Sequence, residues 1–132
     1  MALVDPRIKK QAKILVDYSL KVKPGEKVVV NSEFIAKPLV LEIYKLLIKR
    51  GAYEAKLRFS DYEFTEAYYK NAKDAQLKYF SKTDFAAIKT IDCYVRIGAP
   101  TNTRGLTGID ASVILERSKV VKPITDWRVE KT

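Results

Sequence analysis

The sequence predicts an α/β domain, a small three-layer αβα arrangement around a mostly parallel sheet, with the element order of Rossmann- or flavodoxin-like folds. Three observations support this prediction. Helical patterns alternate with short apolar runs along the 132 residues. The stretches between the apolar runs are long enough for the helical crossovers that parallel strands require. The composition, 47% hydrophobic and 31% charged, is that of one folded globular domain.

The first two elements are a helix and a buried strand. Asp5 and Pro6 form a strong helix start, a side-chain N-cap followed by proline at the first helical position. Apolar residues then recur at helical spacing until residues 23–26 (KPGE) make a turn. Residues 27–30 (KVVV) are short and β-branched, which is typical of a strand covered on both faces.

The second helix and the remaining strands follow the same alternation. Pro38 begins a helix that Gly51 ends at its C′ position. Residues 53–59 alternate apolar and charged side chains, which indicates a strand with one solvent-exposed face near an edge of the sheet. Residues 93–97 (CYVRI) are the third strand.

Short helices connect the second and third strands. We expect one at residues 61–70 and a second, split one at residues 74–80 and 84–90, with Asp74 and Asp84 as caps. In the first of these helices the spacing predicts that the aromatic rings at positions 64 and 68 face the core, although such rings also stack on nucleic-acid bases.

The C-terminal part of the chain changes character at Pro123. Asp110 caps a last helix that we expect to end near Lys122, and the polar residues 123–132 lack a partner strand. We therefore divide the chain into an α/β domain at residues 1–122 and a connector at residues 123–132.

Two residue counts exclude whole classes of chemistry. The chain has no histidine, so it holds neither a histidine-activated nucleophile nor a His-ligated zinc. Its single cysteine, Cys93, forms no intramolecular disulfide or CxxC pair and is interpreted as a small buried hydrophobe. The lack of disulfides, signal peptide and apolar spanning segment favours a cytoplasmic protein without a membrane partner.

The formal charge of +9 raises the question of a nucleic-acid partner. The lysines are spread singly along nearly every element, and glycine-rich phosphate motifs are missing. The lysine-rich composition, poor in thermolabile residues, also resembles that of hyperthermophile proteins. A solvated basic surface is therefore favoured, and a free-standing basic module that binds RNA or DNA remains the alternative.

Polar residues gather where the strands end, which is where parallel α/β sheets bind ligands. They lie after the first strand (Asn31, Ser32, Glu33), after the second (Ser60, Asp61, Glu63) and along residues 96–104. If these loops converge, they form a polar cleft; the alternative is that Ser32 and Asp61 cap helices and Asn102 belongs to a turn. We expect no catalytic or metal-ligating constellation. The candidate cavity-facing residues are Arg96, Asn102, Arg104, Ser32 and Asp61.

A succession of motifs carries a family resemblance that runs from Asp5 to about Trp127. They are DPRI at 5–8, AKILVDYSLKV at 12–22, KPGEKVVV at 23–30, PLVLEIY at 38–44, RGA at 50–52, AQL at 75–77, DCYVRIGAPTNTR at 92–104 and GID at 108–110. In this order they resemble the N-terminal region of the thermophilic metallo-aminopeptidases, the family of aminopeptidases T and S and related leucyl aminopeptidases.

The resemblance implies a cytoplasmic homodimeric enzyme that removes N-terminal residues from peptides. Its dinuclear centre, of zinc, cobalt or magnesium, would be held by Glu, His and Asp residues of a C-terminal domain, beside a catalytic Glu and a Tyr. None of these residues can be assigned to this chain. We therefore expect a non-catalytic N-terminal domain, inactive alone and without its own cofactor, which helps to form the substrate cavity.

Overall fold

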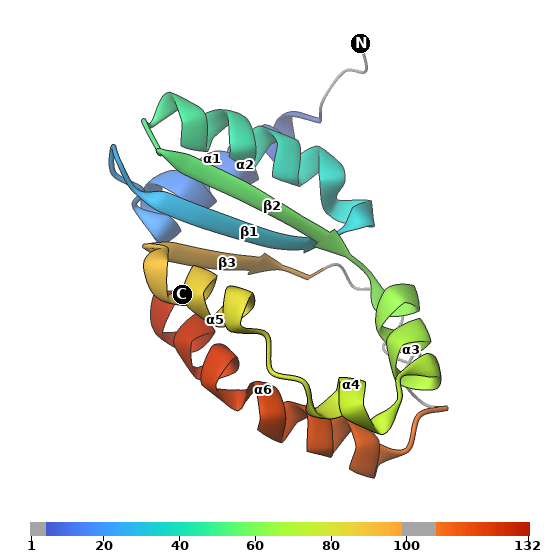
Figure 1. Ribbon diagram of the computed structural model, residues 1–132. Coiled ribbons are helices and arrows are strands. Elements are labelled where there is room, and N and C mark those ends of the chain that lie inside the picture. Colours follow the sequence, from blue (N-terminus) through green and yellow to red (C-terminus); the bar gives the residue numbers. More distant parts are fainter. Residues whose placement is uncertain (1–4, 99–107) are drawn as a thin grey trace.

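The computed structural model describes residues 5–98 and 108–132. Strands β1 (Lys27–Glu33), β2 (Glu54–Ser60) and β3 (Cys93–Ile97) form an all-parallel sheet of order β2-β1-β3, shown in Figure 1. Helices flank both faces of the sheet, so the predicted three-layer α/β class is confirmed.

Strand burial follows strand position. The central strand β1 contains the apolar run and buries three consecutive valines, Val28, Val29 and Val30. Strand β2 lies at one edge and leaves Lys56, Leu57 and Arg58 exposed to solvent. The expectations of a doubly covered strand and an edge strand are both confirmed.

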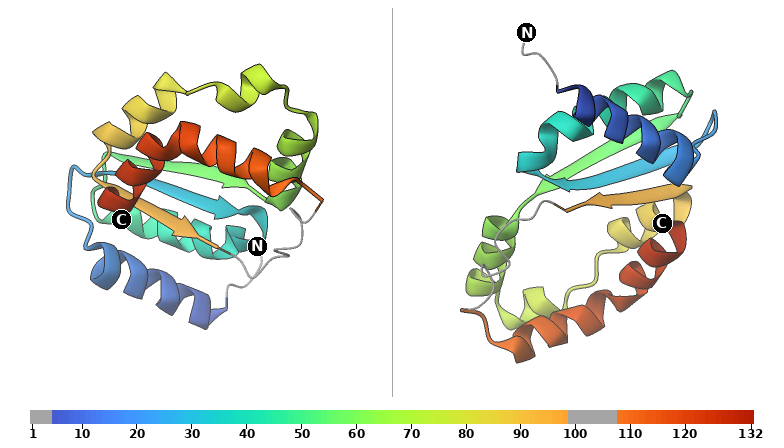
Figure 2. Two further views of the ribbon diagram at one scale, coloured as in Figure 1. Left: turned by 90° about the horizontal axis from the view of Figure 1, so that it is seen from below. Right: turned by 180° about the vertical axis from the view of Figure 1, so that it is seen from behind.

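One face of the sheet is covered by the first helices of the chain (Figures 1 and 2). These are α1 (Pro6–Ile14), its π-helical continuation η1 (Leu15–Leu20) and α2 (Lys37–Lys49), which follows the short 3₁₀ turn η2 (Phe34–Ala36). Together with the sheet they enclose the main core, which consists of Ala12, Val16, Val28, Val30, Val40, Ile43, Leu47 and Val95.

The opposite face is covered by α5 (Lys82–Thr90) and α6 (Ala111–Lys131). The short helix α4 (Asp74–Lys78) packs on α6, and α3 (Tyr62–Asn71) follows the carboxyl end of β2. This side has a smaller buried core, made of Val29, Ile88, Ile91, Tyr94 and Ile124.

The predicted end of the last helix is wrong. Helix α6 continues through Pro123 to Lys131, with Ile124 buried and Trp127 packed against the smaller core. An internal proline costs a helix about 3 kcal/mol, but burial of one large apolar side chain contributes about 1.5–3 kcal/mol. Burial of Ile124 together with partial burial of Trp127 therefore offsets the cost. The division at residues 122 and 123 stays a prediction about the parent protein.

Three predicted helix starts are confirmed, because Asp5, Asp61 and Asp110 each accept a hydrogen bond from a backbone N–H of the first turn. The capping roles given to Asp74 and Asp84 are wrong. Lys73 is the N-cap of α4, and Ser81 caps α5 by accepting from the N–H of Asp84. Both aspartates instead lie in the first turn, where the helix dipole also favours negative charge. An aspartate is favoured both at the N-cap and in the first turn, so the residue type alone does not tell which of the two it occupies.

The rings of α3 do not face the core as expected. Phe64 is 62% exposed and Tyr68 is 37% exposed, and the helix buries no residue. The reason is the place of α3, which extends past the end of β2 rather than lying over the sheet (Figure 1). The ring of Phe64 contacts only the neighbouring ring of Phe34, at 5.9 Å between centroids, among the described aromatic pairs.

Gly51 ends α2 as predicted, with a φ of +88°. A Cβ atom there would lie 3.1 Å from the Cβ of Pro24, so the turn needs glycine for both reasons. Within residues 5–98 and 108–132, no helix is both long and apolar enough to cross a lipid bilayer.

Candidate functional site

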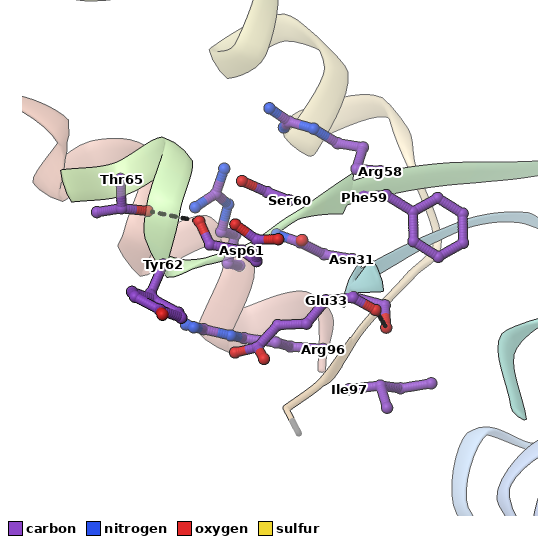
Figure 3. A pocket seen from close by; sticks show the side chains of 12 residues that line it. Asn31, Glu33, Arg58, Phe59, Ser60, Asp61, Tyr62, Thr65, Arg96 and Ile97 are labelled. Atoms are coloured by element: carbon purple, nitrogen blue, oxygen red, sulfur yellow. Dashed lines mark hydrogen bonds between the residues drawn. The ribbon is translucent and has the colours of Figure 1, made fainter. Parts of the chain in front are cut away.

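A cavity of about 570 Å³ opens at the carboxyl ends of the strands (Figure 3). Strand order β2-β1-β3 makes the gap between β1 and β3 the switch point of the sheet, because the crossover after β1 leads to β2 on one side of it and the crossover after β2 returns to β3 on the other side. Ligands of open parallel sheets bind at this place. The cavity is therefore where the fold itself predicts a binding site.

Three of the five candidate residues meet at this cavity. Ser32 contributes from the end of β1, Asp61 from the start of α3 and Arg96 from β3. Asn31, Glu33 and Ser60 line it as well, but Glu63 does not belong to the lining. Asn102 and Arg104 lie outside the described residues. The predicted convergence of strand ends is present, and the functional role of these residues stays a prediction.

Ser32 and Asp61 both have structural roles. Ser32 is 3% exposed, and its hydroxyl donates a hydrogen bond of 3.0 Å to the backbone oxygen of Glu33. It lies within β1 and caps no helix. Asp61 caps α3, since its Oδ1 accepts from the backbone N–H of Glu63 at 3.0 Å. Neither side chain is arranged as a nucleophile or a general base.

The register of the sheet places two arginines beside the central strand. Asn31 of β1 is paired with Arg58 of β2 on one side and with Arg96 of β3 on the other. Paired residues of parallel strands point to the same face, so these three side chains form a row across the sheet. The Nδ2 of Asn31 donates to the Oη of Tyr94 at 2.8 Å, which fixes the amide in the middle of the row.

Helix α6 adds a third arginine above this row. The guanidinium carbon of Arg128 lies 5.5 Å from the centre of the Tyr94 ring, a cation–π distance. Its Nε atom is buried and has no hydrogen-bond partner among the described residues. Arg128 lines the cavity together with Arg58 and Arg96. We call these three residues the arginine triad.

Two members of the triad were missed from the sequence. Arg58 was assigned to the solvent-exposed face of an edge strand, and Arg128 to the connector. Their contribution depends on strand register and on the continuation of α6 past Pro123. A partial signal for Arg58 was available, because this residue lies close to the end of its strand, where parallel sheets bind ligands.

The lining combines opposite charges. The arginine triad is accompanied by the carboxylates of Glu33 and Asp61, while Phe59 and Ile97 provide apolar surface. Guanidinium groups bind carboxylates and phosphates through paired hydrogen bonds. The cavity is therefore suited to binding an anionic or zwitterionic group.

A family model described as thermophilic metalloprotease (M29) matches residues 4–132. The chain belongs to this family. The M29 match confirms the resemblance drawn from the motifs, and it covers nearly all of the sequence. No curated protein matches the chain.

The fold agrees with the M29 assignment. The structure is similar to that of wild-type AmpT from Thermus thermophilus, with a TM-score of 0.71 over 93% of this chain at 15% sequence identity. At this identity the likeness shows the shared fold. The matched region is 33% of the AmpT chain, so this sequence spans about a third of that protein.

The M29 family description implies a divalent metal, and the residues present do not fit one. The sequence has no histidine. In the described ranges, no three His, Cys, Asp or Glu side chains are grouped so that they could hold an ion. The two carboxylates of the cavity share it with three guanidinium groups, which disfavours a cation by charge repulsion.

The only cysteine lies away from the cavity, at the first residue of β3. Burial raises the pKa of the Cys93 thiol, and the nearby carboxylates of Glu26 and Asp92 raise it further. The thiolate is the reactive form of cysteine. This environment therefore favours the inert thiol expected from the sequence.

Proposed function

We propose that this chain is the N-terminal, non-catalytic domain of a metal-dependent aminopeptidase that removes N-terminal residues from peptides, and that it is inactive alone. The observation that supports this most directly is a mismatch. A metalloprotease family model matches residues 4–132, yet these residues include no histidine and no described group of metal ligands.

The missing chemistry would be supplied by a C-terminal metal-binding domain of the same polypeptide. That domain would hold a dinuclear centre of zinc, cobalt or magnesium, in a cytoplasmic homodimer acting on peptides. The length of AmpT, about three times the matched region, supports a larger parent protein. The contribution of the present chain would be a rigid α/β wall of the substrate cavity.

The surface proposed to face that cavity is the carboxyl end of the sheet. It is the concave part of this domain that brings together polar side chains from all three strands and from α3 and α6. Ser32, Asp61 and Arg96 line it in the structure, and we propose the same orientation for Asn102 and Arg104.

An activity assay tests the proposal. The purified chain is incubated with leucine p-nitroanilide and added Zn²⁺, Co²⁺ or Mg²⁺, with EDTA as the control, and metal binding is followed by calorimetry. We expect neither metal-dependent release of nitroaniline nor stoichiometric metal binding. Metal-dependent turnover by the chain alone would refute the assignment.

A salt series separates this proposal from the nucleic-acid alternative. Binding to RNA or DNA through phosphate contacts weakens linearly on a log–log plot as salt rises. In a mobility-shift assay at 50 to 200 mM salt, we expect no retained complex from an aminopeptidase domain. A complex with that salt dependence would instead favour the basic binding module.

A further inference from the structure

The arginines of this protein divide into two groups by their partners. Six of the seven lie in the described residues. Arg7 donates to Asp5, Arg50 to Asp17, and Arg117 to the backbone oxygens of Leu77 and Tyr79.

The other three arginines are the triad. Over residues 5–98 and 108–132, no hydrogen bond or ion pair engages Arg58, Arg96 or Arg128. All three line the same cavity. The guanidinium groups without a protein partner are therefore concentrated at one place in the fold.

This concentration is imposed by the framework rather than by flexible loops. Arg58 and Arg96 flank Asn31 through the sheet register, so their Cα atoms are separated by two strand spacings, about 10 Å. Arg128 reaches the same place from α6, where Ile124 fixes the helix in the smaller core. Three cations are thus held on separate rigid elements around one cavity, where an anion bound between them would lower their mutual repulsion.

Arg128 is the most constrained member of the triad. Its Nε is buried against the protein with no acceptor, although a buried polar atom normally has a partner. One face of the guanidinium is held over Tyr94, which restricts its rotation. The ring contact therefore holds the guanidinium group in place at the edge of the cavity.

The rest of the lining limits the charge of that ligand. Carboxylates also belong to the described lining, at Glu33 and Asp61. A ligand carrying several phosphates would be repelled by these carboxylates, whereas a single carboxylate brings the smallest negative charge to the arginines. The amide N–H groups and ammonium of a peptide are also donors that the Asp61 carboxylate and the Asn31 oxygen accept. A volume of about 570 Å³ lies in the range of small-ligand sites.

We propose that the arginine triad is a binding site for the carboxylate of a short peptide. The inference rests on the proposed function in taking a peptide as the ligand. The carboxylate comes from the peptide C-terminus or from an acidic side chain, and the two sources share the same chemistry. Because all three arginines are residues of this chain, we expect the peptide to bind without any metal ion.

The test is an NMR titration of the chain with the tripeptide Leu-Gly-Gly, following the Arg Nε–H and Asn31 signals. Two further peptides, Leu-Gly-Gly amide and Leu-Asp-Gly amide, separate the carboxylate sources. We expect the free acid to shift the triad signals and Leu-Gly-Gly amide to bind at least about tenfold more weakly, as loss of a charge-assisted hydrogen bond implies. Recovery of binding by Leu-Asp-Gly amide would show that the site also accepts the carboxylate of an acidic side chain, and no recovery would assign the site to the peptide C-terminus.

Arg58→Gln, Arg96→Gln and Arg128→Gln test the residues one by one, with Arg7→Gln as the matched control for loss of one positive charge. We expect at least fivefold weaker binding for each triad variant and unchanged binding for the control. Thermal unfolding of each variant verifies that it is folded. At position 128, the charge-conserving Arg128→Lys keeps the cation and the aliphatic stem, so it distinguishes loss of the paired hydrogen bonds from loss of charge and packing.

Three results would overturn the proposal. They are equal binding of the free acid and both amides, equal weakening by Arg7→Gln, and tighter binding of inorganic phosphate than of any carboxylate. None of these results bears on the proposed function. The proposed function fails on a different observation, which is metal-dependent turnover of leucine p-nitroanilide by the unmodified chain.

Discussion

The two faces of the sheet are built differently. On the α1–α2 face, Ala12, Val16, Ile43 and Leu47 have no solvent exposure and form the larger core. On the α5–α6 face, the smaller core is bordered by a second cavity of about 420 Å³, which Val29, Ile88, Ile91 and Tyr94 also line. The first face is closed and supplies stability, while the second stays open enough to hold a pocket.

Truncation in the larger core has the largest expected effect. Leu47→Ala removes a fully buried side chain from between α2 and the sheet. We expect the free energy of unfolding to fall by about 3–5 kcal/mol, since closely packed surroundings relax poorly around a new cavity. Urea unfolding followed by circular dichroism measures the change. A loss below about 1 kcal/mol would contradict a closed first face.

A matched truncation on the other face has a smaller expected effect. Ile124→Ala removes a side chain that is 4% exposed and belongs to the smaller core. We expect a loss of about 2 kcal/mol, the low end for such substitutions, because a cavity already borders this core. The same urea experiment applies. An equal loss of unfolding free energy for Ile124→Ala and Leu47→Ala would contradict the difference between the two faces.

Acid sensitivity is the smallest expected effect, and Asp17 is one source of it on the first face. Arg50 donates two hydrogen bonds to Asp17, at 2.8 and 2.9 Å, and they lower the pKa of that carboxyl. A carboxyl whose pKa is lower in the folded state contributes stability above its unfolded pKa, about 4, and loses it as the pH falls through the folded pKa.

We therefore expect the unfolding free energy to decline below about pH 4, and to decline less steeply in Asp17→Asn. Urea unfolding between pH 2.5 and 7 measures both slopes. Lys45→Gln, which removes the partner of Glu42 in the same helix layer, is the control. If the unfolding free energy of Asp17→Asn declines with pH as steeply as that of the parent chain, Asp17 does not contribute to the acid sensitivity.

The sequence predicted most of the framework because the signals were local. Asp5 with Pro6, the valine run of β1 and Gly51 each impose a conformation through their own side chain or its lack. The end of α6 was missed for the opposite reason. Pro123 is a local helix breaker, and only packing of Ile124 and Trp127 against a distant part of the chain overrides it.

The same distinction explains the candidate site. Ser32, Asp61 and Arg96 were found because the ends of parallel strands meet at one edge of a sheet. Arg58 and Arg128 were not found, since no local pattern reveals that both approach Asn31. Phe64 was misplaced in the same way, because helical spacing identifies a shared face but not whether that helix lies over the sheet.

Tyr94 belongs to the smaller core and contacts two residues that line the cavity at the carboxyl ends of the strands. Its ring is buried beside Ile124 and beneath Arg128, and its hydroxyl accepts from Asn31. A ligand that binds the folded state alone adds to its stability by mass action. A ligand bound at the arginine triad would thus slow amide hydrogen exchange first in α6 and β3, before it slows exchange in the α1–α2 layer. Local opening of the last helix would in turn release the ligand.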